Sequence, residues 1–121
     1  MFVNVPARFL LELGFFPQHS GFGYLVYAIG KISSDPMGYY SGKTDIFDAL
    51  GKEYDVSESC AKRCMYYSIQ CAWHLPNNNE LRGIFGSCTR SCPPSLAEFI
   101  CRLALELNDR QSSRSAEAAG A

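Results

Sequence analysis

The residues whose side chains are the clearest candidates for chemistry are the six cysteines. Four of them form two pairs, each with three residues between its members. Cys60 and Cys64 make the first pair, and Cys88 and Cys92 make the second. Paired thiols can bind zinc or form a disulfide, but neither pair has the pattern of a recognised structural zinc site. Free cysteine is also among the most commonly buried residue types. We therefore expect reduced thiols packed at the margin of the core, with metal binding and a redox role as alternatives.

An enzyme is the function that the sequence supports least. His19 and His74 stand apart, and the sequence places no serine or carboxylate partner beside either of them. No phosphate-binding loop, paired carboxylates or nucleophile with an adjacent base stands out. We therefore expect no catalytic residue, no bound metal and no cofactor.

A second set of candidate residues lies on the helix predicted from Glu58 to His74. Successive residues are about 100° apart around a helix axis, so its apolar residues fall on one arc, which we expect to face the core. The opposite arc carries polar side chains at Lys62, Arg63, Tyr66, Tyr67 and Gln70. Arg63 suits a guanine edge, Gln70 suits an adenine edge, and Lys62 suits a phosphate or a base.

Two interpretations of this polar arc are open. It is either the recognition helix of a DNA-binding protein or an ordinary solvated face with its tyrosines packed against a neighbour. In the first case Ser57 and Ser59, near the helix start, offer hydroxyls or amides to phosphate. A preceding helix at Thr44–Tyr54, capped by Thr44, is joined by a link of about three residues, which is the spacing of a helix-turn-helix.

Helical periodicity continues through most of the chain, with turn-forming residues between the helices. We expect helices at Val5–Leu13, from Ser20 or Gly21 past Ile32, at Thr44–Tyr54, at Glu58–His74, up to Phe85 after a cap at Asn79, and at Leu96–Leu107 after a cap at Ser95. The segment SSDPMGYYSG between the second and third helices is expected to be a loop. The fold class is therefore all-α, a compact bundle of about six helices.

Length and charge limit the domain organisation and the partners. The 121 residues suit one domain, which we place at residues 1–107, followed by a disordered polar tail at 108–121. The formal net charge is −1, which argues against tight, non-specific binding of nucleic acid but leaves room for a local basic patch. No apolar stretch is long enough to cross a bilayer, and we expect a cytoplasmic protein with reduced thiols.

Four segments, in a consistent order and spacing, resemble one known family. They are GYLVYAI (Gly23–Ile29), IFDALGKEYDVSESCAKRCMYYSIQCAW (Ile46–Trp73), LRGIFG (Leu81–Gly86) and PSLAEFICRLALEL (Pro94–Leu107). Together they resemble the C-terminal DNA-binding effector domain of the master response regulator of sporulation in endospore-forming bacteria. The resemblance covers about residues 5–107 and implies six helices with a helix-turn-helix at their centre.

The resemblance implies a transcription regulator of the sporulation-initiation type. The helix Glu58–His74 would lie in the major groove of double-stranded DNA, and Thr44–Tyr54 would cross the backbone. The last helix would take part in self-association, and HLPNNNEL would contact the RNA polymerase sigma subunit. The family protein also has an N-terminal receiver domain, for which this chain has no room, so we expect a fragment or a stand-alone protein without that switch.

The chain departs from the family in the charges of the recognition helix. Arg63 keeps the family's arginine, but Cys60 and Tyr66 stand where the family has arginines. Residues 43–90 hold six Lys or Arg against six Asp or Glu, so fewer phosphate contacts are expected. The alternative function is a protein-interaction module that kept the fold, lost DNA reading, and binds a related regulator or RNA polymerase.

Overall fold

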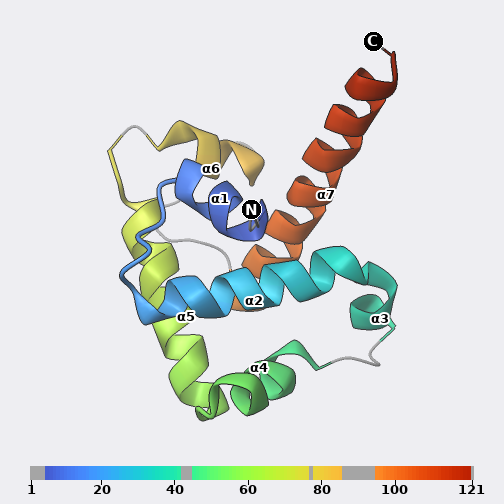
Figure 1. The fold of residues 1–121 in the computed structure, drawn as a ribbon. Coiled ribbons are helices and arrows are strands. Elements are labelled where there is room, and N and C mark those ends of the chain that lie inside the picture. The colour runs from blue at the N-terminus through green and yellow to red at the C-terminus, as the bar shows by residue number, and fades with distance from the viewer. Residues whose placement is uncertain (1–4, 42–44, 77, 86–94, 121) are drawn as a thin grey trace.

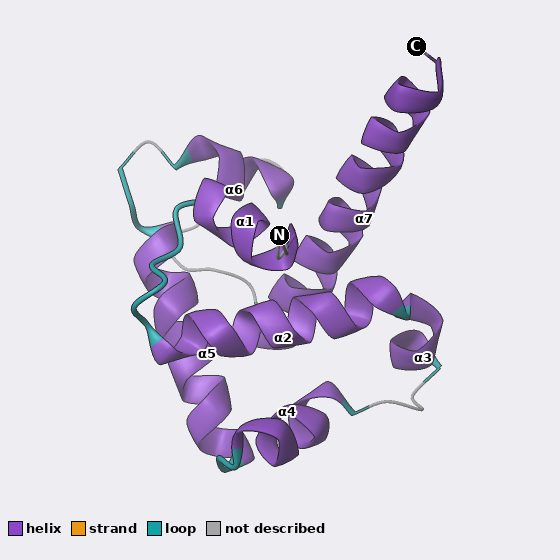
Figure 2. Ribbon diagram, in the orientation of Figure 1, coloured by secondary structure: helices purple, strands orange, loops and turns teal. Residues whose placement is uncertain are grey.

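The computed structural model describes residues 5–41, 45–76, 78–85 and 95–120, and within these ranges it contains seven helices and no strand (Figures 1 and 2). The helices are α1 (Val5–Glu12), α2 (Ser20–Ser34), α3 (Pro36–Tyr40), α4 (Ile46–Tyr54), α5 (Glu58–Trp73), α6 (Asn79–Ile84) and α7 (Leu96–Gly120). The predicted all-α fold is confirmed. Six of the helices correspond to the predicted ones, and α3 is additional.

Helix α2 lies at the centre of the bundle and packs against α1, α4, α5 and α7 (Figure 1). Its buried face carries apolar side chains at the three- and four-residue spacing of an amphipathic helix. These side chains are Phe22, Leu25, Ala28, Ile29 and Ile32. Every other large helix therefore takes its position from a contact with this one element.

An aromatic cluster closes the end of the core where α5, α6 and α7 meet. The rings of Phe85 and Phe99 are stacked, with centroids 4.8 Å apart. Trp73 contacts Phe85 edge-on at 5.6 Å, and Phe15 contacts Phe99 edge-on at 6.1 Å. Such ring pairs add about 0.5–1.5 kcal/mol each beyond the burial of their area. The cluster fixes the C-terminal end of α5 against the rest of the bundle.

Three helix starts differ from the prediction. Pro36–Tyr40 is helical although a loop was expected there, because the Asp35 carboxylate accepts a hydrogen bond from the Gly38 amide at 3.1 Å and proline suits a first helical position. Asp45, not Thr44, caps α4, and it accepts from the amides of Phe47 and Asp48. Thr44 itself lies outside the described residues.

The predicted cap at Asn79 was also wrong. Helix α6 begins at Asn79, and the cap position belongs to Asn78, whose side chain accepts no capping bond. Its amide nitrogen instead donates to the carbonyl oxygens of Leu13 at 2.9 Å and Ala72 at 2.7 Å. These two bonds tie the turn after α1 to the end of α5.

Ser95 caps α7 as predicted, because its hydroxyl accepts a hydrogen bond from the Glu98 amide.

The last helix is longer than the sequence predicted. We expected it to end at Leu107 before a disordered tail, whereas α7 continues to Gly120. Residues 108–119 include the strong helix formers Ala, Arg, Gln and Glu and neither Gly nor Pro. Arg110 also fastens the helix, because it contacts Glu106 at 3.1 Å and Glu80 of α6 at 3.2 Å. The division of the chain into a domain at 1–107 and a tail stays a prediction.

The crossing of α2 and α5 depends on the absence of a side chain at Gly21. A Cβ atom at this position would lie 2.1 Å from the carbonyl oxygen of Cys64, which is far inside van der Waals contact. The obstructing atom is backbone and cannot rotate away. A Cβ atom at Gly23, two residues along the same helix, would meet nothing within 4 Å.

We predict that Gly21→Ala lowers the free energy of unfolding by about 1–3 kcal/mol or more, because α2 and α5 must separate to admit the methyl group. Gly23→Ala, the matched control, should raise it by about 0.5–1 kcal/mol, since alanine is the better helix former. Urea denaturation followed by circular dichroism measures both. Equal stabilities of the two variants would contradict the close approach.

Candidate nucleic-acid interface

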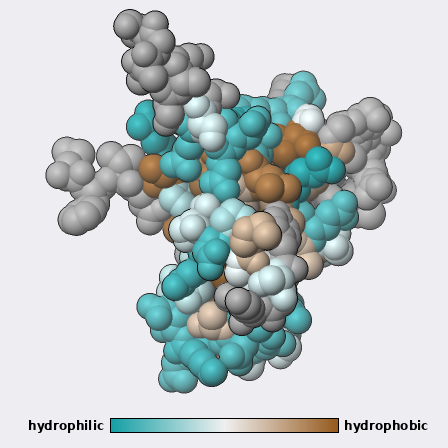
Figure 3. Space-filling model, turned by 90° about the vertical axis from the view of Figure 1, so that its right-hand side faces the viewer, coloured by the Kyte–Doolittle hydropathy of each residue, from teal (hydrophilic) through white to brown (hydrophobic). Residues whose placement is uncertain are grey.

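Helices α4 and α5 form the expected helix-turn-helix; in Figure 1 α4 and the turn lie at the bottom, and α5 runs from there up the left side. The link between them is short because Asp55 adopts a left-handed conformation, with φ 53°, that reverses the chain directly after α4. Ser57 then caps α5, as predicted, and its hydroxyl accepts from the Cys60 amide at 3.2 Å. The lower end of the molecule, where α4 lies, has a mostly hydrophilic surface in the view of Figure 3.

The structure keeps the predicted contact residues on the side of α5 away from its core face. The residues buried on the core face are Ala61, Met65, Ser68, Ile69, Ala72 and Trp73. The predicted DNA contacts divide into two groups by exposure. Exposed side chains are Ser57, Ser59, Arg63 and Tyr67, and partly buried ones are Lys62, Tyr66 and Gln70.

Lys62 is held against α4, although its side chain is still 45% exposed. Its amine lies 3.6 Å from the Glu58 carboxylate and 4.7 Å above the ring centre of Phe47. Glu58, one turn earlier, therefore compensates the charge of Lys62. An exposed ion pair of this kind contributes at most about 1 kcal/mol to the free energy of unfolding. To meet a phosphate, Lys62 has to exchange this carboxylate for the phosphate oxygen.

Arg63 has the opposite surroundings. It is exposed, and its guanidinium forms no ion pair or hydrogen bond with any residue in the described part of the chain. A guanidinium carries five donors in a planar fork, which matches a guanine edge or a phosphate without prior rearrangement. Among the predicted contacts, Arg63 is therefore the cation that is ready to bind an acceptor.

Tyr67 contacts His19 and Cys71, and neither residue was connected with it in the sequence analysis. Its ring is 59% exposed and lies 5.2 Å from the ring of His19, which in turn lies 5.3 Å from Phe16. A hydrogen bond with Cys71, followed by the charge of that thiol, raises the pKa of Tyr67. A neutral phenol can donate a hydrogen bond to a phosphate.

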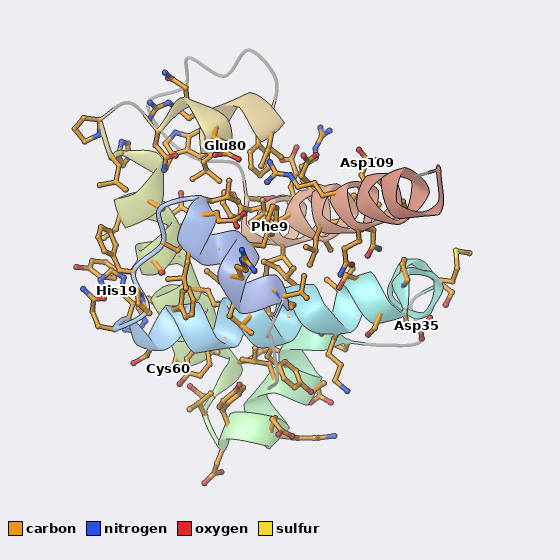
Figure 4. All side chains as sticks on the ribbon, turned by 45° about the horizontal axis from the view of Figure 1, so that its top comes forward. Phe9, His19, Asp35, Cys60, Glu80 and Asp109 are labelled. Carbon is orange, nitrogen blue, oxygen red and sulfur yellow. The ribbon has the colours of Figure 1, made fainter. Side chains whose placement is uncertain are left out.

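His19 was judged isolated in the sequence, but it belongs to this surface. It precedes α2, at the point where α2 crosses α5, and Figure 4 shows it on the same side of the molecule as Cys60. Its Nδ1 atom is buried and has no hydrogen-bond partner among the described residues. Spacing alone gave no signal for this residue, because its contact with α5 is made to Tyr67, 48 positions away in the sequence.

A cavity of about 670 Å³ opens between the turn before α2 and the N-terminal half of α5. Its α5 wall is made by Cys60, Arg63, Cys64 and Tyr67, and His19 and Ser20 contribute to the opposite side. Two predicted DNA contacts and two of the cysteines therefore share one hollow. The sequence placed them on neighbouring arcs of one helix but could not show the hollow, which depends on the position of α2.

The cysteines that the structure describes form no disulfide with one another, and all are partly buried: Cys60, Cys64, Cys71 and Cys101. Burial, followed by the neighbouring Cys60, raises the pKa of Cys64, and the charge of Arg63 acts in the opposite direction. No cluster of three or more His, Cys, Asp or Glu residues suited to a metal occurs in the described ranges. Cys88 and Cys92 lie outside them, so the four-cysteine metal alternative is not tested.

One family model matches the chain, described as "Sporulation initiation factor Spo0A C terminal", and the match covers residues 7–107. The chain belongs to this family. The Spo0A C-terminal family is one of DNA-binding effector domains of sporulation regulators and not a family of enzymes. The resemblance drawn from the four sequence segments is thereby confirmed. No curated protein matches the chain.

No described helix is both long and apolar enough to span a membrane.

We predict that Ser57→Ala destabilises the domain by about 1 kcal/mol, because the Cys60 amide loses its capping acceptor at the start of α5. Ser59→Ala is the matched control, since Ser59 is equally exposed and makes no cap bond. Thermal unfolding monitored by circular dichroism compares the two variants. A larger loss in Ser59→Ala than in Ser57→Ala would be inconsistent with the cap.

Proposed function

We propose that this protein is a sequence-specific DNA-binding transcription regulator of the sporulation-initiation type, and that α5 enters the major groove. The observation that carries the proposal is the state of Arg63, an exposed cation on the outer face of the helix-turn-helix that has no ion pair with any described residue. Helix-turn-helix proteins read bases with such side chains near the start of the second helix. Family membership supports DNA binding, and Arg63 supports the reading of bases.

The proposed roles of the contact residues follow from their surroundings. Arg63 binds a base edge, and Gln70, about two turns further along the same face of α5, pairs with adenine. Tyr66, Tyr67 and the hydroxyls of the helix start bind phosphates. Lys62 contributes a phosphate contact only after it leaves Glu58. A cytoplasmic location stays a prediction.

Replacing Arg63 tests the proposal directly. We expect Arg63→Ala to abolish the enriched motif in a binding selection from a random duplex library, because one bidentate base contact provides about 1–3 kcal/mol of discrimination. Arg8→Ala is the control, since it removes an equal charge from α1, where Arg8 pairs with Glu12. An unchanged motif in Arg63→Ala would remove the role assigned to this residue.

Replacing Glu58 tests the electrostatics of the same surface. We predict that Glu58→Gln tightens DNA binding by a similar factor on all duplexes and steepens its salt dependence, because Lys62 becomes available to phosphate. Glu98→Gln makes the same charge change at the start of α7. Fluorescence anisotropy at several salt concentrations separates the two variants. Identical salt slopes would show that Lys62 does not take part.

A protein-interaction function is the second candidate, and a specific cluster favours it. Tyr54 at the end of α4 is 43% exposed and contacts the rings of Tyr24 and Tyr27 of α2 at 5.1 and 5.7 Å. Tyrosine is enriched at protein interfaces. Under this hypothesis the chain binds a related regulator or RNA polymerase. A contact with the sigma subunit and self-association through α7, which the family resemblance implies, stay predictions. The random-duplex selection decides, because the hypothesis predicts no enrichment even at low salt.

A further inference from the structure

Cys60 and Cys64 occupy neighbouring turns of α5, and both line the cavity between α5 and the start of α2. Both are free and partly buried. Residues four apart on a helix lie on the same face, one turn apart, so the two side chains are neighbours. The two thiols are therefore a pair in space, with access from solvent through the hollow and with Arg63 and Tyr67 beside them.

The helix favours a bridging atom between the two sulfurs over a direct disulfide. Residues four apart on a helix have Cβ atoms about 5–6 Å apart. A disulfide requires about 3.5–4.5 Å between these atoms, so it would distort the middle of α5. A soft metal or metalloid atom inserted between the sulfurs, with bonds of about 2.3 Å to each, spans the longer distance without moving the backbone.

The number of side chains that can coordinate an ion at this pair limits which ions the site can bind. No third His, Cys, Asp or Glu joins the pair to form a metal cluster within the described residues. A tetrahedral zinc site takes four ligands and is not built by this pair alone. Thiolates select soft ions, and a pair of thiolates satisfies one that accepts two sulfur ligands.

We propose that Cys60 and Cys64 form a dithiol site for one soft thiophilic ion, of the class of univalent copper and trivalent arsenic, whose binding stops DNA reading by Arg63 and Tyr67. Binding is not a redox step. With an arsenoxide, two S–H bonds and the As–O bonding break, two S–As bonds form, and the two protons leave with the oxygen as water. The regulatory half of the proposal rests on the proposed DNA-binding function, whereas the site itself does not.

Phenylarsine oxide is the probe for the site. The protein is the full chain with Cys88→Ser and Cys92→Ser, because these two cysteines form a second pair of the same spacing. We expect intact mass measurement to show one phenylarsenic group and thiol titration to show the loss of two thiols. Cys60→Ser and Cys64→Ser should each abolish the stable adduct, and Cys71→Ser and Cys101→Ser should retain it. No adduct, or an adduct that survives Cys60→Ser, overturns the site.

Univalent copper, titrated against a chelator of known affinity, identifies the ion within the class. Copper binding that disappears in Cys60→Ser assigns the site to copper, and an arsenic adduct without copper binding assigns it to the metalloid. Both results support the dithiol site.

The regulatory half is tested with the duplex enriched from the random library. Occupation by phenylarsine oxide should weaken binding by about tenfold or more, the loss expected when one good base contact is removed. Cys60→Ser should bind DNA equally with and without the probe. An adduct that forms without any change in DNA affinity overturns the regulatory half. Failure of the protein to enrich any duplex counts against the proposed function alone, since the mass measurement does not involve DNA.

Discussion

The crossing of α2 over α5 at Gly21 is the constraint on which the structure depends. The Cys64 carbonyl lies where any side chain at residue 21 would begin, so the two helix backbones are in direct contact. This contact sets the depth of α5 in the bundle and therefore which of its residues reach the surface. It also brings His19 to Tyr67 and forms the hollow that Cys60 and Cys64 line. The contact between His19 and Tyr67 and the hollow beside the two thiols both depend on this one glycine.

The two basic side chains of α5, Lys62 and Arg63, lie on different sides of the helix and have different electrostatic surroundings. Toward α4, Lys62 is compensated by Glu58 and rests on Phe47. Toward α2, Arg63 has no such partner among the described residues. A near-neutral protein can therefore still present one cation that binds without first giving up another contact. This arrangement favours discrimination between bases over strong attraction to any phosphate backbone, which agrees with the formal charge of −1.

The sequence predicted what depends on local rules. The periodicity of Ala61, Met65 and Ile69 predicted the buried face of α5, and Ser57 was correctly recognised as its cap. Helix α3 was not predicted from the sequence, although Asp35 and Pro36 together form a helix-start signal. The placement of the contact arc on α5 was predictable, but the different surroundings of Lys62 and Arg63 were not. These depend on how α4 and α2 pack against α5, which no spacing within α5 encodes.

The side chain of Asn78 has a consequence for how the chain folds. It donates to the carbonyl of Leu13 across 65 positions of sequence, and to that of Ala72 only six positions away. Closing the longer loop costs more chain entropy, so it follows the assembly of nearer contacts such as that between α4 and α5. During synthesis, the turn after α1 has no access to this anchor until residue 78 has left the ribosome. The turn after α1 thus gains its anchor to α5 late, although α1 itself packs against the neighbouring α2.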